Sequence, residues 1–121
     1  LMLPGKPDKK MVYWASWSYL GELLELGMRC FLYEDGFLHA KTIVVDGKIA
    51  SVGTANFDMR SFRLNFEVNA VIYDTETARK VCEAFEEDAR RCRELTYAEY
   101  RARPKIEFLR ESFIRLVSPI L

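Results

Sequence analysis

Apolar residues recur at helical spacing in three stretches of the chain. The first runs from about 12 to 26 and is followed by Gly27, a residue suited to the left-handed conformation that ends many helices. The second covers about 75–94 and is preceded by Asp74, whose carboxylate can cap the helix N-terminus. Its predicted inner face consists of Ala78, Val81, Cys82, Phe85 and Ala89.

The third helical stretch covers about 97–117 and contains Pro104. Proline disrupts a helix interior, so we expect an interruption there. At the other end of the chain, the apolar first three residues resemble the tail of a buried strand that enters a turn-rich loop at 4–10. A native N-terminus is rarely so apolar, so we expect that the chain is part of a longer protein.

Strands are predicted where apolar and β-branched residues lie between turn-forming residues. They cover about 29–33, 39–45, 49–52 and 66–73. Asp46 and Gly47 separate the second strand from the third, and both residue types tolerate the positive φ angles of a tight hairpin turn. The polar stretch 53–64 is predicted to be a loop.

Helices and strands alternate along the 121 residues, a length that suits one compact core rather than two. We therefore predict the α/β (α+β) class, with a mixed β-sheet flanked by helices. The whole chain, residues 1–121, is interpreted as a single domain.

The balance of charges disfavours a nucleic-acid partner. Eighteen basic residues match eighteen acidic ones, whereas proteins that follow nucleic-acid phosphates usually have a basic excess. The three cysteines are far apart, and the single histidine lies away from them, so no zinc site is expected. No apolar run reaches the roughly 20 residues that cross a bilayer.

Candidate chemistry lies in the segment around His39 and Lys41, which a strand would project from the same face. Histidine can act as nucleophile or general acid–base near neutral pH, and lysine offers a fixed charge to a phosphate oxygen. The hairpin at Asp46 would bring Asn56 back toward His39. Such a set resembles a metal-free phosphoryl-transfer site, with one nucleophile and donors aimed at developing charge.

Taken singly, each of these residues has a simpler structural explanation. A strand histidine is more often structural than catalytic, and exposed lysines are common. Asp46 and Asn56 fit a turn and a loop. The spacing of the whole set is what favours catalysis.

The pattern HxKxxxxD from His39 to Asp46, followed by Gly-Thr-x-Asn at 53–56, resembles the HKD signature of the phospholipase D superfamily. Thr54 stands where the signature usually has serine, and it keeps the hydroxyl. Flanking segments resemble the C-terminal half of bacterial cardiolipin synthases. These segments are Tyr13–Ala15, Ser18–Leu24, Gly36–Lys41, Gly53–Phe62, Leu64–Asn69 and Leu116–Pro119.

The resemblance implies that two HKD motifs form one site and transfer a phosphatidyl group between two phosphatidylglycerol molecules. Cardiolipin forms and glycerol is released, through a phosphohistidine. His39 would be the histidine of this half, acting either as the nucleophile or as the general acid. Lys41 and Asn56 would hold phosphate oxygens, with the Thr54 hydroxyl in support.

Two further residues are carried over from the same family. Glu67 corresponds to a carboxylate that hydrogen-bonds the histidine and fixes its tautomer. Asp46 corresponds to the aspartate of the motif, whose role is more structural than chemical. No metal and no organic cofactor are implied.

The implied partners are the N-terminal HKD half of the same protein and the bacterial cell membrane, where the full-length protein would be located. A homodimer of the fragment is another way to unite two histidines. Two other readings stay open: a single-motif phosphodiesterase or nuclease that acts as a homodimer, and a non-catalytic half kept for assembly.

Overall fold

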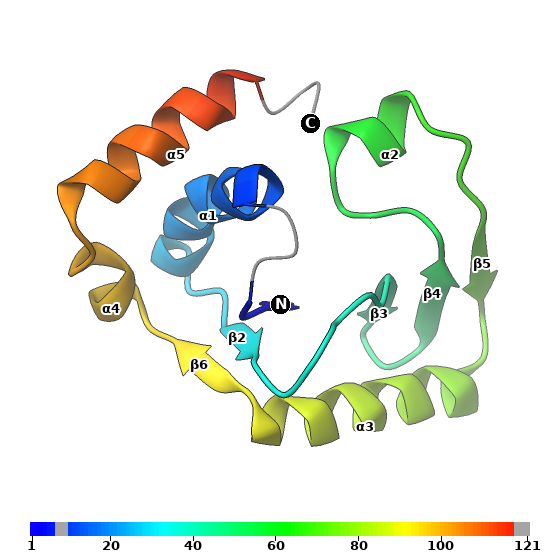
Figure 1. Cartoon of the computed structure of the whole chain (residues 1–121). Coiled ribbons are helices and arrows are strands. Elements are labelled where there is room, and N and C mark those ends of the chain that lie inside the picture. Colours follow the sequence, from blue (N-terminus) through cyan, green and yellow to red (C-terminus); the bar gives the residue numbers. More distant parts are fainter. Residues whose placement is uncertain (7–9, 118–121) are drawn as a thin grey trace. The chain divides into compact units, whose positions relative to one another are not determined.

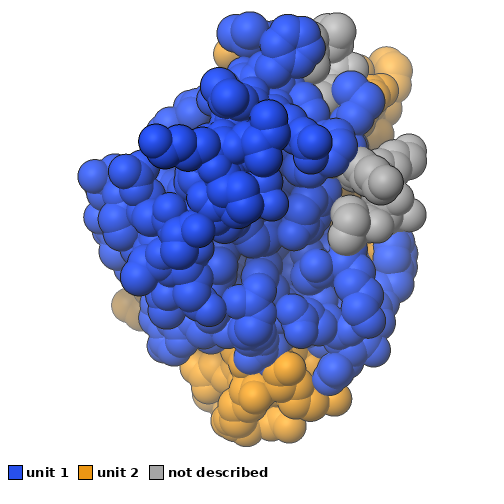
Figure 2. Space-filling view, turned by 60° about the vertical axis from the view of Figure 1, so that its left-hand side comes forward, with its two compact units in different colours: residues 1–38, 92–121 blue, residues 39–91 orange. Residues whose placement is uncertain are grey.

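A computed structural model describes residues 1–6 and 10–117 of the chain, which form two compact units (Figures 1 and 2). Unit 1 combines residues 1–38 with residues 92–121, and unit 2 consists of residues 39–91. Part of the predicted N-terminal loop, at 7–9, and the C-terminal residues 118–121 lie outside the described residues. The alternation of helices and strands confirms the predicted α/β class.

Unit 1 contains a mixed three-stranded sheet in the order β1-β2-β6. Its strands are β1 (Met2–Pro4), β2 (Cys30–Tyr33) and β6 (Arg93–Leu95). β1 runs parallel to β2, as expected of a strand that is followed by a helix, and β6 is antiparallel to β2. The helical prediction for residues up to 94 is wrong at its end, because residues 93–95 pair with β2 instead.

Three helices complete unit 1: α1 (Lys10–Glu25), α4 (Tyr97–Arg101) and α5 (Lys105–Val117). α1 ends before Gly27, whose φ of 84° confirms the predicted left-handed residue. The expected break near Pro104 is present, since α4 ends before it and α5 starts after it. α1 packs against both later helices. The buried core residues are Trp17, Leu20, Leu24, Cys30, Leu32, Leu95 and Tyr100.

One arginine is enclosed by this core. The guanidinium of Arg103 lies 4.5 Å from the ring centroid of Trp17, 4.1 Å from that of Tyr100 and 4.8 Å from that of Phe108. Both of its terminal nitrogens donate to the carboxylate of Glu111, at 2.5 and 3.0 Å. Glu111 is only 3% exposed, so this ion pair is largely shielded from water.

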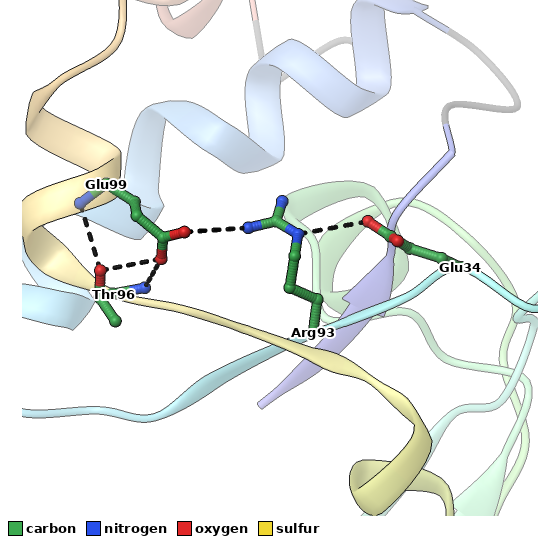
Figure 3. A network of polar contacts seen from close by, with 4 residues as sticks. All are labelled: Glu34, Arg93, Thr96 and Glu99. Carbon is green, nitrogen blue, oxygen red and sulfur yellow. Dashed lines mark hydrogen bonds and ion pairs between the residues drawn. The ribbon is translucent and has the colours of Figure 1, made fainter.

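The N-terminus of α4 is fixed by a capping box, in which Thr96 and Glu99 bond each other's main-chain nitrogen (Figure 3). Arg93 reaches Glu99 and Glu34, each at 3.4 Å, and so links β6 to the end of β2 (Figure 3). These ion pairs are exposed, and each adds little to stability.

Unit 2 contains an antiparallel sheet in the order β3-β4-β5. The elements are β3 (Thr42–Val45), β4 (Ile49–Gly53), α2 (Met59–Arg63), β5 (Asn69–Ile72) and α3 (Thr75–Arg91). Asp74 caps α3 as predicted, accepting from the main chain of Thr77 at 2.7 Å. The stretch 53–64, predicted to be a loop, contains the short helix α2.

The β3–β4 hairpin has the predicted turn. Asp46 and Gly47 have φ angles of 52° and 62°, the positive values that a type I′ turn requires at both central positions. The turn is closed by Lys48, whose main-chain N–H donates to Val45 at 3.0 Å. This turn sets which residues of the two strands face each other.

The sheet of unit 2 has one covered face and one open face. α3 packs on β3 and β4, and Ala50 and Ala78 are fully buried. The other residues predicted for the inner face of α3 are half-buried. Side chains alternate across a strand, so Ile43, Val45 and Val71 project from the face opposite to Ala50. They are about half exposed, which leaves an apolar surface on this unit.

Candidate functional site

Five of the predicted site residues lie at one end of the unit 2 sheet. His39 and Lys41 precede β3, Thr54 and Asn56 follow β4, and Glu67 precedes β5. In an antiparallel sheet, the start of β3, the end of β4 and the start of β5 occur at the same end. The strand arrangement therefore gathers residues that are up to 28 positions apart.

The predicted strand 39–45 starts three residues late, at Thr42. The main-chain N–H of Gly53 still bonds the carbonyl of Lys41 at 3.2 Å, but the next residue, Thr54, bonds Val68 of the segment before β5 at 3.0 Å. β4 therefore pairs with residues 41–45 and no further back. The ammonium of Lys41 donates to the carbonyl oxygen of exposed His39 at 3.3 Å.

Glu67 is the centre of the hydrogen bonding at this end of the sheet. Its Oε2 accepts from the hydroxyl of Thr54 at 2.6 Å. Its Oε1 accepts from the hydroxyl of Ser61 at 2.9 Å and from the amide of Asn65 at 3.2 Å. The bonds from Thr54, Ser61 and Asn65 lower the pKa of Glu67, and the charge of Lys41 acts in the same direction. Glu67 is thus held as a carboxylate.

The strand prediction for 66–73 is too long because of this network. Val68 directs its N–H to the hydroxyl of Thr54, at 3.0 Å, and the regular ladder of β5 begins only at Asn69. The orientation of the histidine by Glu67, which the family resemblance implies, stays a prediction.

Ser61 is a residue of this region that the sequence interpretation missed. It is 7% exposed and lies in α2, whose N-cap Asp58 accepts from the main-chain N–H of Ser61 at 2.7 Å. Its hydroxyl also accepts from the main-chain N–H of Asn56, at 3.1 Å. Asp58 is of a residue type preferred at helix N-caps, which could have indicated the start of α2 but not the contacts of the Ser61 hydroxyl.

Asp46 is the one member of the predicted set that the sheet places elsewhere. It lies in the hairpin turn, at the end of β3 opposite to His39 and Lys41. Its positive φ explains why this position suits aspartate, a residue that tolerates the left-handed region. The position agrees with a structural role in setting the hairpin register.

Among the described residues, no group of three or more His, Cys, Asp or Glu side chains is arranged to hold a metal ion. None of the helices in the described ranges is both long enough and apolar enough to cross a membrane. What this end of the sheet does offer is one histidine, one ammonium group and a fixed carboxylate, on exposed or half-exposed residues. These groups suit proton transfer and the binding of an anion.

Residues 1–89 match the family described as "Cardiolipin synthase, PLD-like domain". The chain belongs to this family of phospholipase D-like domains, which confirms the resemblance of its HKD segment.

Over all 121 residues it is 57% identical to the major cardiolipin synthase ClsA of Bacillus subtilis (strain 168). It is 50% identical to the cardiolipin synthase of Oceanobacillus iheyensis and 53% identical to that of Listeria monocytogenes, again over its whole length. The chain spans about a quarter of each of these relatives (25%). No solved structure gives a significant match.

Proposed function

We propose that the chain is one catalytic half of a cardiolipin synthase, a phosphatidyltransferase of the phospholipase D superfamily. The observation that carries the proposal is the gathering of His39, Lys41, Thr54, Asn56 and Glu67 at one end of the sheet in a member of this family. The substrate would be phosphatidylglycerol and the products cardiolipin and glycerol. The site of action would be the bacterial cell membrane.

The proposed reaction has two displacement steps at phosphorus. In the first, a histidine nitrogen attacks the phosphorus of one phosphatidylglycerol, the bond to the glycerol headgroup breaks, and a second histidine protonates the leaving glycerol oxygen. In the second step, the histidine that protonated the glycerol removes a proton from the headgroup hydroxyl of another phosphatidylglycerol. That oxygen attacks the phosphohistidine, the P–N bond breaks, and cardiolipin forms.

The residues of this chain have separate tasks in that scheme. His39 is one of the two histidines, as nucleophile or as acid and base. Lys41 balances the charge that develops on the non-bridging oxygens, and the amide of Asn56 donates to them. Glu67, ionised at neutral pH, orients the histidine and stabilises its charged form.

The chain has a single histidine, so the second must come from elsewhere. Because the relatives are about four times as long (25% is covered), we place it in an N-terminal HKD half of the same protein. The half-exposed apolar face of β3 and β5 is a surface that such a half could cover.

The 121-residue chain alone should be folded but inactive as a monomer, because two-histidine chemistry needs both groups. Its exposed apolar surface should cause self-association, and a two-fold homodimer would bring two His39 side chains together. Light scattering at several concentrations, combined with assays on phosphatidylglycerol and on DNA, tests this expectation. Robust phosphatidylglycerol turnover by a strict monomer would contradict the mechanism, and turnover of DNA alone by a dimer would favour the single-motif nuclease.

Replacing Glu67 by glutamine in the complete enzyme should lower activity by roughly 10- to 100-fold, the usual effect of losing an orienting partner. The folded-state pKa of Glu67 is lowered, so its contribution is present at neutral pH and is lost as pH falls through that pKa. The wild-type rate should therefore decline on the acid side, and the variant should lack that part of the decline. A pH–rate profile measures both, and wild-type activity in the variant would remove Glu67 from the site.

A further inference from the structure

We propose that Ser61 is a positioning residue of this site, whose hydroxyl holds the Glu67 carboxylate and the main chain of Asn56 in their working places. The inference rests on the proposed function and adds to it a residue outside the HKD signature. It follows from the position of the hydroxyl of Ser61, a buried residue, between two predicted site residues.

The direction of both hydrogen bonds is fixed by chemistry. The main-chain N–H of Asn56 can only donate, so at 3.1 Å the Ser61 oxygen accepts from it. The single hydroxyl proton of Ser61 is then available to the ionised carboxylate of Glu67, at 2.9 Å. One side chain thus connects the loop after β4 to the segment before β5. At 7% exposure, Ser61 is too buried for water to replace these partners freely.

The capping role of Ser61 is separable from its hydroxyl. The bond from Ser61 to the N-cap Asp58 comes from the main-chain N–H, at 2.7 Å, and any residue other than proline keeps it. Replacement by alanine therefore leaves the cap of α2 in place. It removes only the two contacts that reach Asn56 and Glu67.

Loss of the hydroxyl would leave Glu67 with its bonds from Thr54 and Asn65. The charged group that faces it, Lys41, would be unchanged. With one bond to the charged form removed, the pKa of Glu67 would move back toward its ordinary value. The carboxylate would be held by one bond fewer, and the main-chain N–H of Asn56 would lose its acceptor.

The test is Ser61→Ala in the complete enzyme, with phosphatidylglycerol in vesicles as substrate. We expect kcat to fall roughly 10- to 100-fold, as for other partners of site residues, with KM changed much less. The acid side of the pH–rate profile should move to higher pH. Ser18→Ala is the matched control, because it deletes the same atoms from a part-buried serine whose hydroxyl donates to Ala15 within its own helix.

A double-mutant cycle decides whether Ser61 acts through Glu67. If it does, Ser61→Ala should cost less when Glu67→Gln is already present, since residues in one network are not additive. Full additivity, an unchanged kcat, or an equal loss in Ser18→Ala would each overturn the proposal. If Ser61→Ala did not fold, Ser61→Cys fills similar space with a weaker donor and permits the same cycle.

Failure of the inference differs from failure of the proposed function. If the complete enzyme makes no cardiolipin but cleaves bis(para-nitrophenyl) phosphate, the function is wrong, and the cycle can still be measured with that phosphodiester. If cardiolipin forms and the cycle is additive, the function stands and Ser61 has no positioning role.

Discussion

Replacing His39 by alanine in the complete enzyme should abolish cardiolipin formation and leave the stability of the fold nearly unchanged. Removing the nucleophile or the acid–base group of a covalent mechanism commonly lowers kcat by roughly 10⁴-fold or more. His39 is exposed and precedes β3, so its side chain contributes little to core packing. Cardiolipin production from labelled phosphatidylglycerol and a thermal unfolding curve measure the two effects.

Lys48→Ala is a suitable control for this variant. Lys48 is exposed and closes the hairpin turn at the other end of the same strands. The Lys48→Ala enzyme should keep the activity and the melting temperature of the wild type. A His39→Ala enzyme that lost activity together with its cooperative unfolding would favour a structural role for the histidine, and one that kept its activity would refute the proposed site.

Replacing Glu111 by alanine should destabilise unit 1 by about 3 kcal/mol, because it leaves a charge enclosed without its partner. The side chains of Arg103 and Glu111 are 13% and 4% exposed and form a bidentate ion pair. The three aromatic rings around Arg103 would remain, but they cannot replace a carboxylate. Urea unfolding of the 121-residue chain, followed by tryptophan fluorescence, measures the change.

The same arginine offers a matched control. Glu107 is 3.5 Å from Arg103, but its side chain is 44% exposed, so Glu107→Ala should cost less than about 1 kcal/mol. The double variant Arg103→Met/Glu111→Leu should recover much of the loss, since apolar residues often replace a buried ion pair without penalty. Equal effects from Glu107→Ala and Glu111→Ala would show that Arg103 is effectively solvated.

Features with a local cause could be predicted from the sequence. Gly27, Asp74, the Asp46-Gly47 turn and the break at Pro104 all occur where the pattern places them. The wrong predictions concern strands whose bounds depend on a distant pairing partner. β6 exists because it meets β2 across more than fifty intervening residues, and β3 starts late because its neighbour turns toward another segment. A one-dimensional pattern contains neither contact.

In the candidate site, too, the features with a local cause were predictable and those that depend on distant contacts were not. Register and turn geometry were enough to predict that Lys41 and the residues after β4 lie at one end of the hairpin. The bonds from Ser61 and Asn65 to Glu67 were not predictable, because α2 itself was taken for a loop. Polar residues in a short helix give little periodic signal. Their hydrogen-bonding role in the site can be assigned only when their partners are known.

The pairing of β2 with β6 also has a consequence for how the chain reaches its native state. Arg29, which precedes β2, and Glu94 of β6 bond each other and are 65 residues apart. Closing a flexible loop of that length costs on the order of 4 kcal/mol in chain entropy. β6 also leaves the ribosome only after all of unit 2 has been made. Early hairpin formation at Asp46 and Gly47 shortens the loop that must be closed, so the middle of the chain is expected to speed completion of a sheet to which it contributes no strand.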